Sequence, residues 1–281
     1  MCVAQAQRLT HPANRAKHSL MTPAQHAEAA RWISSRRIAG TSLADIPASL
    51  RPADAEEGYA VARLVREELT KAGRGALVGW KVGATTAAMQ KLLNVPGPCA
   101  GAMLASSQLA SPAKVDAKRY LKIGCECEVA VRLAKPLGKG TTRKDAEAAI
   151  AALYPAIEIV DNRCGDFAAM GPATLIADDF FHAGFVLGPE VRDWQRLDLA
   201  SAVGVTRANG VEVQRGKGSD VLGHPFESLV WLANLLGSHG ERIEPGQIVM
   251  TGSLPLPHWA SAGQHIEISI DGLGSAQVTL L

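Results

Sequence analysis

The sequence predicts an α+β fold in which a mixed, largely antiparallel β-sheet is rolled around its core, with a helical N-terminal segment before it. Short apolar runs separated by Gly and Pro fill the chain after residue 75. Asn209-Gly210 lies between two such runs, and Asp271-Gly272 precedes the last one; both dipeptides are typical of tight turns between antiparallel strands. The chain before residue 75 carries helix start and stop signals instead.

Helices account for the first part of the chain. Residues 1–21 show no period and are expected to form a flexible tail. Thr22-Pro23 predicts the start of a helix that stops at Gly40, and a second helix is expected over residues 53–71, ended by Gly73. We therefore divide the chain into a flexible tail (1–21), an N-terminal helical segment (22–74) and a strand-rich domain (75–281).

Strands dominate the rest, interrupted by two helices. One helix is expected over residues 143–152, capped by Thr142, and one over residues 225–236, whose apolar stripe repeats at helical spacing. The expected strands are residues 77–82, 120–133, 156–160, 184–187, 201–207, 211–214, 247–251, 265–270 and 275–281.

Composition excludes several classes of protein. The chain has 281 residues, 47% of them hydrophobic, which suffices for a full core. Its net charge of +2 is spread along the sequence, so a nucleic-acid partner is not expected. We find no membrane span and no signal peptide, and predict a cytoplasmic protein. Five cysteines show no paired spacing, so reduced thiols are expected rather than disulfides or zinc ligands.

The most informative motif is Glu126-Cys127-Glu128 inside an alternating stretch. Residues two apart in a strand share a face, so the two carboxylates should start about 6 to 7 Å apart at the backbone. Ile123, Cys125, Cys127, Val129 and Val131 would form the opposite, core face. A half-buried pair of acids is costly unless a cation or protons neutralise it. The alternative is a solvated outer strand with two exposed acids.

Glu158 favours the cation. It lies between Ile157 and Ile159 in another strand-like run and would point away from what they pack against. Three carboxylates without clustered histidines suit an oxygen-preferring ion, Mg²⁺ or Mn²⁺. Glu126, Glu128 and Glu158 are therefore the predicted metal ligands.

Five motifs in order carry a family resemblance. They are GWKVGATTAAMQ (79–90), ECE (126–128), AIEIVDNR (156–163), HPFESLVWLAN (224–234) and EPGQIVMTGS (244–253). From about Leu43 to the C-terminus the chain resembles the fumarylacetoacetate hydrolase superfamily, in its branch of 2-keto-4-pentenoate hydratases and 4-oxalocrotonate decarboxylases. The resemblance implies a fumarylacetoacetate hydrolase C-terminal domain-like fold and the same three glutamates as ligands of Mg²⁺ or Mn²⁺. It also implies a homo-oligomer.

The resemblance further implies the chemistry. The substrate would be a small 2-oxo or 2-hydroxy-dienoic acid, and the reaction the addition of water to a 2-hydroxy-2,4-dienoate through an enolate that the metal stabilises. Decarboxylation of a 4-oxalocrotonate-like 2-oxo diacid would use the same enolate. Hydrolysis of an acylpyruvate ranks lower because an early HxxxE-like signature is absent. A metal-binding partner subunit without activity is the non-enzymatic alternative.

Lys81 is the candidate catalytic residue. It alternates with Trp80 and Val82 in an apolar strand, so confinement is expected to lower its pKa toward the working range. The resemblance places the matching lysine in the substrate pocket; the alternative is a lysine that snorkels from a strand end. Gly79 and Gly83 suit a close approach of backbone to substrate, although each is also typical of a turn.

Other substrate contacts are expected at two places. Thr251, Gly252 and Ser253 end a strand, where they would bind a substrate carboxylate or simply cap the strand. His182 is a further candidate contact, with a hydrogen bond to backbone as the alternative. Asp161 and Arg163 are expected to form a structural ion pair.

Three segments differ from the branch pattern. An acid expected after the lysine motif is replaced within Pro98-Cys99-Ala100-Gly101. Residues 177–182 read ADDFFH where ADNASS is usual, and residues 254–257 read LPLP in place of a hydroxyl residue. All three would line the pocket rather than hold the metal, so they affect the predicted substrate.

Overall fold

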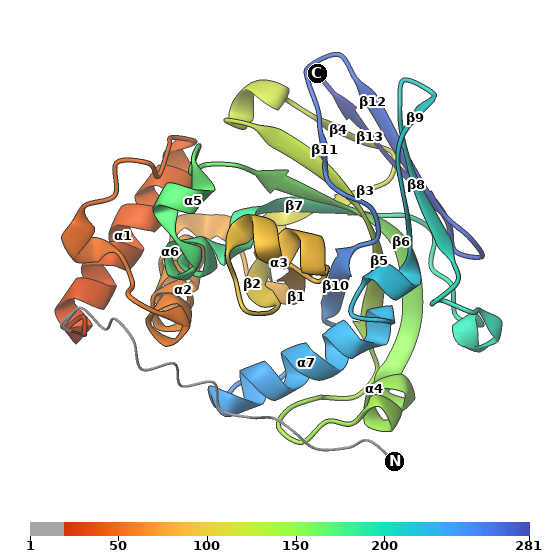
Figure 1. The fold of residues 1–281 in the computed structure, drawn as a ribbon, viewed down its shortest axis with the longest axis horizontal. Helices are drawn as coiled ribbons and strands as arrows, with labels where there is room; N and C mark the ends of the chain where they lie inside the picture. The colour runs from red at the N-terminus through yellow and green to blue at the C-terminus, as the bar shows by residue number, and fades with distance from the viewer. Residues whose placement is uncertain (1–19) are drawn as a thin grey trace.

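The computed structural model describes residues 20–281, and its N-terminal side is helical (Figure 1). Helix α1 (Pro23–Ala39) begins with a capping box between Thr22 and Gln25 and ends at Gly40, which adopts the left-handed conformation. Helix α2 (Ala55–Leu69) starts at the Asp54 cap and continues into a π-helical turn (Thr70–Arg74). Both predicted helices are confirmed. The tail predicted over residues 1–21 lies almost entirely outside the described residues.

These helices share a core with segments much later in the chain. Short helices α5 (Phe167–Met170) and α6 (Pro172–Ala177) pack on this side, α6 directly against α2. One apolar cluster joins residues of α1 and α2 with residues between 84 and 180. The boundary at residue 75 therefore stays a prediction, because the core crosses it.

Two curled sheets form the rest of the molecule (Figure 1). The first has the order β2 (Cys99–Leu104), β1 (Leu77–Gly83), β10 (Ile248–Ser253), β5 (Ile123–Leu133), β6 (Ile150–Asp161), β7 (His182–Leu187) and β3 (Gln108–Ala110), and β11 (His258–Trp259) pairs with β5. The second has the order β4 (Ala113–Val115), β13 (Gly274–Leu280), β12 (His265–Ile270), β8 (Val203–Ala208) and β9 (Val211–Lys217). Most pairings are antiparallel, as predicted; β1–β10, β3–β7 and β4–β13 are parallel.

The apolar face of β5 packs toward the second sheet. Cys125 and Cys127 belong to the same core cluster as Ile266 and Ile268 of β12. A Cβ on Gly204 of β8 would meet the Cys127 sulfur at 3.1 Å, so the two sheets touch here. The core face predicted for this strand is confirmed, and the glutamates face the other way.

Helices cover the remaining sides of the sheets. Helices α4 (Arg143–Ala149) and α7 (Pro225–Ser238) pack against each other below the sheets in Figure 1, and α3 (Ala87–Leu93) lies in front of β1 and β2. None of the helices within residues 20–281 is long and apolar enough to cross a membrane. The four described cysteines are free and buried, as expected.

Several predicted boundaries are wrong. The helix predicted over residues 143–152 ends at Ala149, and β6 begins at Ile150 rather than at residue 156. The reason is tertiary: β5 pairs with β6 from Leu133 opposite Ile150 to Ile123 opposite Asp161, and this ladder overrides local helix propensity. The segment Cys99–Leu104, for which no strand was predicted, is strand β2 and pairs with β1.

Candidate metal centre

Three carboxylates converge on the face of β5 and β6 that points away from the second sheet. Glu126 lies directly opposite Glu158 in the antiparallel ladder, and Glu128 lies opposite the neighbouring Ala156. One oxygen from each of the three glutamates lies within 4.8 Å of the others. Glu158 is 0% and Glu128 is 1% exposed, and Glu126 is partly buried. The alternative of two exposed acids on an outer strand is therefore wrong.

The three glutamates of this cluster differ in pKa. Burial, reinforced by the charge of Glu158, raises the pKa of Glu126 to about 8. Burial and the two neighbouring carboxylates also raise the pKa of Glu128. Burial alone would raise the pKa of Glu158 as well, but Lys81 and His182 outweigh it and lower that pKa. Without a cation, the site therefore favours protons on two of its three acids.

Two oxygens of the cluster lack any partner. Glu128 Oε1 and Glu158 Oε2 are buried without a hydrogen bond, which is costly for a carboxylate. A divalent cation would satisfy both and replace the protons. Three carboxylate donors with no histidine or cysteine among them fit a hard cation such as Mg²⁺. The residues present therefore fit the metal that the sequence predicts.

Lys81 reaches the same cluster from β1. Its side chain is 2% exposed, and its Nζ lies 3.3 Å from Glu158 Oε1. The predicted confinement is confirmed, but the predicted direction of the pKa is wrong. Burial by itself lowers the pKa of the Lys81 ammonium, yet the charges of the three glutamates outweigh burial and raise it. Lys81 is therefore a stable cation in this site.

The His182 ring forms a hydrogen bond with Glu158. Its Nδ1 lies 2.9 Å from Glu158 Oε1, and its Nε2 lies 3.1 Å from the Ser107 hydroxyl. Because both ring nitrogens have protein partners, the geometry favours a positioning role, and the predicted contact with substrate stays a prediction. Ser107 was missed in the sequence, since only the fold brings it to the ring from 75 residues away.

Most polar groups of the Thr251–Ser253 segment that could contact substrate already form hydrogen bonds within the protein. The Thr251 hydroxyl donates to the carbonyl oxygen of Val129 at 2.8 Å, and the Gly252 N–H donates to Glu128 Oε2 at 2.8 Å. Gly252 also has a φ of +111° and lies against Thr85, which excludes a side chain there. Only the Ser253 hydroxyl is buried without a partner. Of the three predicted substrate contacts, Ser253 is the one with a free polar atom.

The predicted glycines meet protein groups. A Cβ on Gly79 would strike the carbonyl of Ile248, and one on Gly83 would strike the ring of Phe180. Gly79 thus permits the β1–β10 contact, while Gly83 leaves room for an aromatic ring. Phe180 also places its ring centroid 5.3 Å from Lys81 Nζ. The bulky segment that departs from the branch pattern therefore covers this side of the site.

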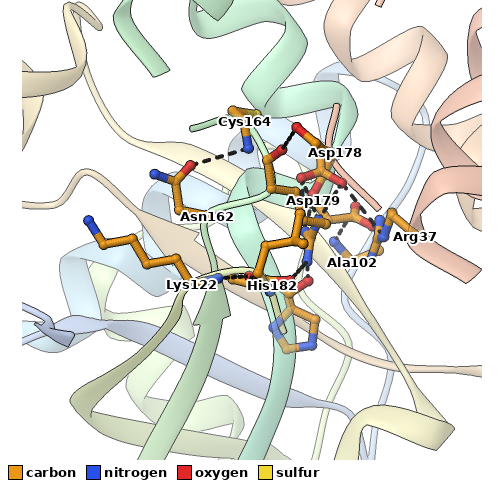
Figure 2. A network of polar contacts seen from close by, with 12 residues as sticks. Arg37, Ala102, Lys122, Asn162, Cys164, Asp178, Asp179 and His182 are labelled. Atoms are coloured by element: carbon orange, nitrogen blue, oxygen red, sulfur yellow. Dashed lines mark hydrogen bonds and ion pairs between the residues drawn. The ribbon is translucent and has the colours of Figure 1, made fainter. Parts of the chain in front are cut away.

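A buried ion-pair network fixes this covering segment (Figure 2). Arg163 donates to both carboxylate oxygens of Asp178, at 3.1 and 2.9 Å, whereas Asp161 lies 4.0 Å away. The predicted Asp161–Arg163 pair is thus secondary to Asp178. Arg37 of α1 binds Asp179 at 2.5 Å, and Asp179 also accepts from the Ala102 N–H. Residues 179–181 all have positive φ, a costly conformation for side chains other than glycine.

Comparison with known proteins matches this architecture to one family. Residues 86–281 match the family model for the fumarylacetoacetate (FAA) hydrolase C-terminal domain. The chain belongs to the fumarylacetoacetate hydrolase family. It is 35% identical over 213 residues to 2-hydroxyhexa-2,4-dienoate hydratase of Comamonas testosteroni, an alignment that covers 75% of this chain and 80% of the relative.

The chain is also similar to 4-oxalocrotonate decarboxylase. The chain is 30% identical over 220 residues to 4-oxalocrotonate decarboxylase of Pseudomonas putida, covering 78% and 83% of the two chains. A solved structure of 4-oxalocrotonate decarboxylase from Pseudomonas putida G7, complexed with magnesium and adipate, superimposes with a TM-score of 0.87 at 28% identity. That superposition covers 92% of this chain and 98% of the other.

Proposed function

We propose that this protein is a divalent-metal-dependent hydratase that adds water to a small 2-hydroxy-2,4-dienoate. The observation that carries the proposal is the convergence of Glu126, Glu128, Glu158 and Lys81 in one buried site. The named hydratase relative supports the reaction class. We assign the three glutamates to Mg²⁺ or Mn²⁺. When bound, the ion supplies positive charge that stabilises negative charge developing beside the 2-oxo group of the substrate.

The side chains of this site supply the proton chemistry and the orientation. Lys81, 2% exposed and with its Nζ 3.3 Å from Glu158 Oε1, is the group that we assign to proton transfer to the substrate carbon skeleton. His182 fixes the Glu158 carboxylate through Nδ1. The Ser253 hydroxyl, free of protein partners, is placed to bind the substrate. Phe180 excludes water from the side of the site that it covers.

The test is turnover of 2-hydroxypenta-2,4-dienoate with added Mg²⁺. We expect loss of the dienol absorbance, which stops with a chelator and in Glu126→Gln, and a hydroxy-oxo acid as the product. A matched control is Glu147→Gln on the exposed surface of α4, which should keep full activity. Turnover that persists unchanged in both the chelator and Glu126→Gln would contradict the proposal.

Decarboxylation of a 4-oxalocrotonate-like diacid is the second candidate. The superposition on a solved 4-oxalocrotonate decarboxylase over 92% of this chain favours it. The segment that lacks the expected acid forms strand β2, which begins at the buried Cys99. The missing acid weakens the case for hydration. Measurement of released carbon dioxide separates the two reactions. Metal binding without turnover of either acid would instead support a partner subunit without activity.

A further inference from the structure

A polar cavity lies beside the carboxylate cluster but is not part of it. It has a volume of about 410 Å³ and is formed by the end of α1, the turn after α2, the segment from β3 to β4 and the turn after β6. Ser107 and His182 line it, whereas Lys81 and the three glutamates do not. Its size falls within the range of small-molecule sites, roughly 300 to 1,000 Å³.

The walls of this cavity carry unpaired positive charge. Arg74, Lys114, Lys118 and Arg119 all line it, and within residues 20–281 none of the four forms an ion pair. They come from three separate elements: the turn after α2, strand β4 and the 3-10 turn Ala117–Arg119. Four unpaired cations around one cavity repel one another, and an anion between them would remove that repulsion.

The other charged groups of the cavity are already engaged. Arg37 and Arg163 also line it, but they form ion pairs with Asp179 and Asp178, respectively. Two acids that line the cavity accept hydrogen bonds from the backbone. Asp116 accepts from the Lys118 N–H, and Asp161 accepts from the N–H groups of Leu121 and Lys122. Four cations against these two acids leave a local charge of about +2.

We propose that this cavity binds a small dianion at a site separate from the metal centre. Two classes of compound have this chemistry, a phosphate group and a short dicarboxylate, and both present oxygens that accept from guanidinium and ammonium groups. Arg74 after α2 and the basic residues between Lys114 and Arg119 would hold such an anion from more than one element. Ser106 and Tyr120, which also line the cavity, add hydroxyl donors.

The test is calorimetric titration with inorganic phosphate and, separately, with succinate. The full-length protein is first stripped of metal and dialysed into chelator-free buffer of low ionic strength, so that neither a bound ion nor a chelating polyanion competes. We expect saturable binding of at least one dianion. The Lys114→Ala/Arg119→Ala double variant should weaken it at least tenfold. The Lys135→Ala/Lys144→Ala double variant, which removes two exposed lysines elsewhere, should leave it unchanged.

Each outcome decides the proposal. Binding of phosphate alone identifies a phosphate site, binding of succinate alone a dicarboxylate site, and both results support it. If the double variant does not fold, the milder variant Lys118→Gln replaces it, and its affinity for the dianion should also be lower than that of the unmodified protein. Absence of saturable binding of either dianion below 10 mM, or equal loss of affinity in the two double variants, would overturn the proposal. Because the titration uses metal-free protein, failure of the hydratase proposal leaves this result intact.

Discussion

At the scale of single residues, each member of the carboxylate cluster has a different environment. Glu158 accepts from His182 and contacts Lys81, Glu128 accepts from the Gly252 N–H, and Glu126 is the most exposed. Glu158 therefore carries the negative charge of the metal-free site, while the other two acids have raised pKa values. This difference makes the contribution of each residue separately testable.

The first prediction concerns Lys81. Replacing it in Lys81→Met should lower kcat about 10² to 10⁴-fold, because the proton at Nζ is lost. Mg²⁺ should bind no more weakly, since a cation that competes for Glu158 has been removed. Steady-state kinetics and calorimetry measure the two effects, with Lys91→Met on exposed α3 as control. Weaker Mg²⁺ binding together with normal kcat would show that Lys81 only supports the site.

The second prediction concerns His182 as a positioning residue. In His182→Ala, Glu158 loses its hydrogen bond, and Mg²⁺ affinity should fall by about 10 to 100-fold. His265→Ala is the matched control, because that ring hydrogen-bonds to Thr279 within the second sheet. Calorimetric titration of Mg²⁺ gives the affinities. An unchanged affinity in His182→Ala would mean that the carboxylate is held by the sheet alone.

At the scale of elements, the segment from Asp178 to His182 connects the helical side to the site. Arg163 follows β6, Arg37 ends α1, and both bind this segment, so the two parts of the molecule meet at one buried network (Figure 2). The network offsets the strain of three successive residues with positive φ. It also holds Phe180 over Lys81. Ion pairs outside the carboxylate cluster therefore set the position of this ring.

A third prediction tests these ion pairs. Arg163→Met leaves the 0% exposed Asp178 with only Arg37, 3.7 Å away, and should destabilise the fold by about 3 to 5 kcal/mol. Adding Asp178→Asn should recover part of the loss, because the buried charge is removed. Urea unfolding measures both variants. The exposed ion pair between Arg192 and Glu190 provides the control, since Arg192→Met should lower the free energy of unfolding by no more than about 1 kcal/mol. An equal loss in both single variants would exclude the buried network.

A fourth prediction tests the contact between β1 and the covering segment. Gly83→Ala should destabilise the protein by about 1 to 3 kcal/mol, because the new methyl group strikes the Phe180 ring. In a Phe180→Ala background the same substitution should cost almost nothing. Gly97→Ala, where no atom lies within 4 Å, is the control. The same penalty in both backgrounds would mean that the ring does not occupy this position in solution.

At the scale of the whole molecule, the two sheets share one core while the first sheet presents its carboxylates to the opposite side. The edge strands β2, β3, β4 and β9 end the two sheets, and Val211 on β9 is 67% exposed. Unpaired edges and exposed apolar residues are places where copies of a chain associate.

The fifth prediction is therefore a homo-oligomer. Light scattering coupled to size-exclusion chromatography at micromolar concentration should give a mass that is a multiple of 29.6 kDa. Val211→Lys should shift the mass toward the monomer if the β9 edge takes part, because a buried charge opposes association. A single monomeric mass for the unmodified chain would contradict the expectation.

The sequence by itself determined the class of fold, most elements and the three glutamates that converge in one cluster. Strand periodicity placed Glu126 and Glu128 on one face, because side chains alternate with a period of two. Tertiary structure decided the rest. The register of β5 against β6 brought Glu158 opposite Glu126, and the same ladder ended α4 early. The pKa of Lys81 and the partners of Thr251 and Gly252 depend on groups far away in the chain, so local sequence could not reveal them.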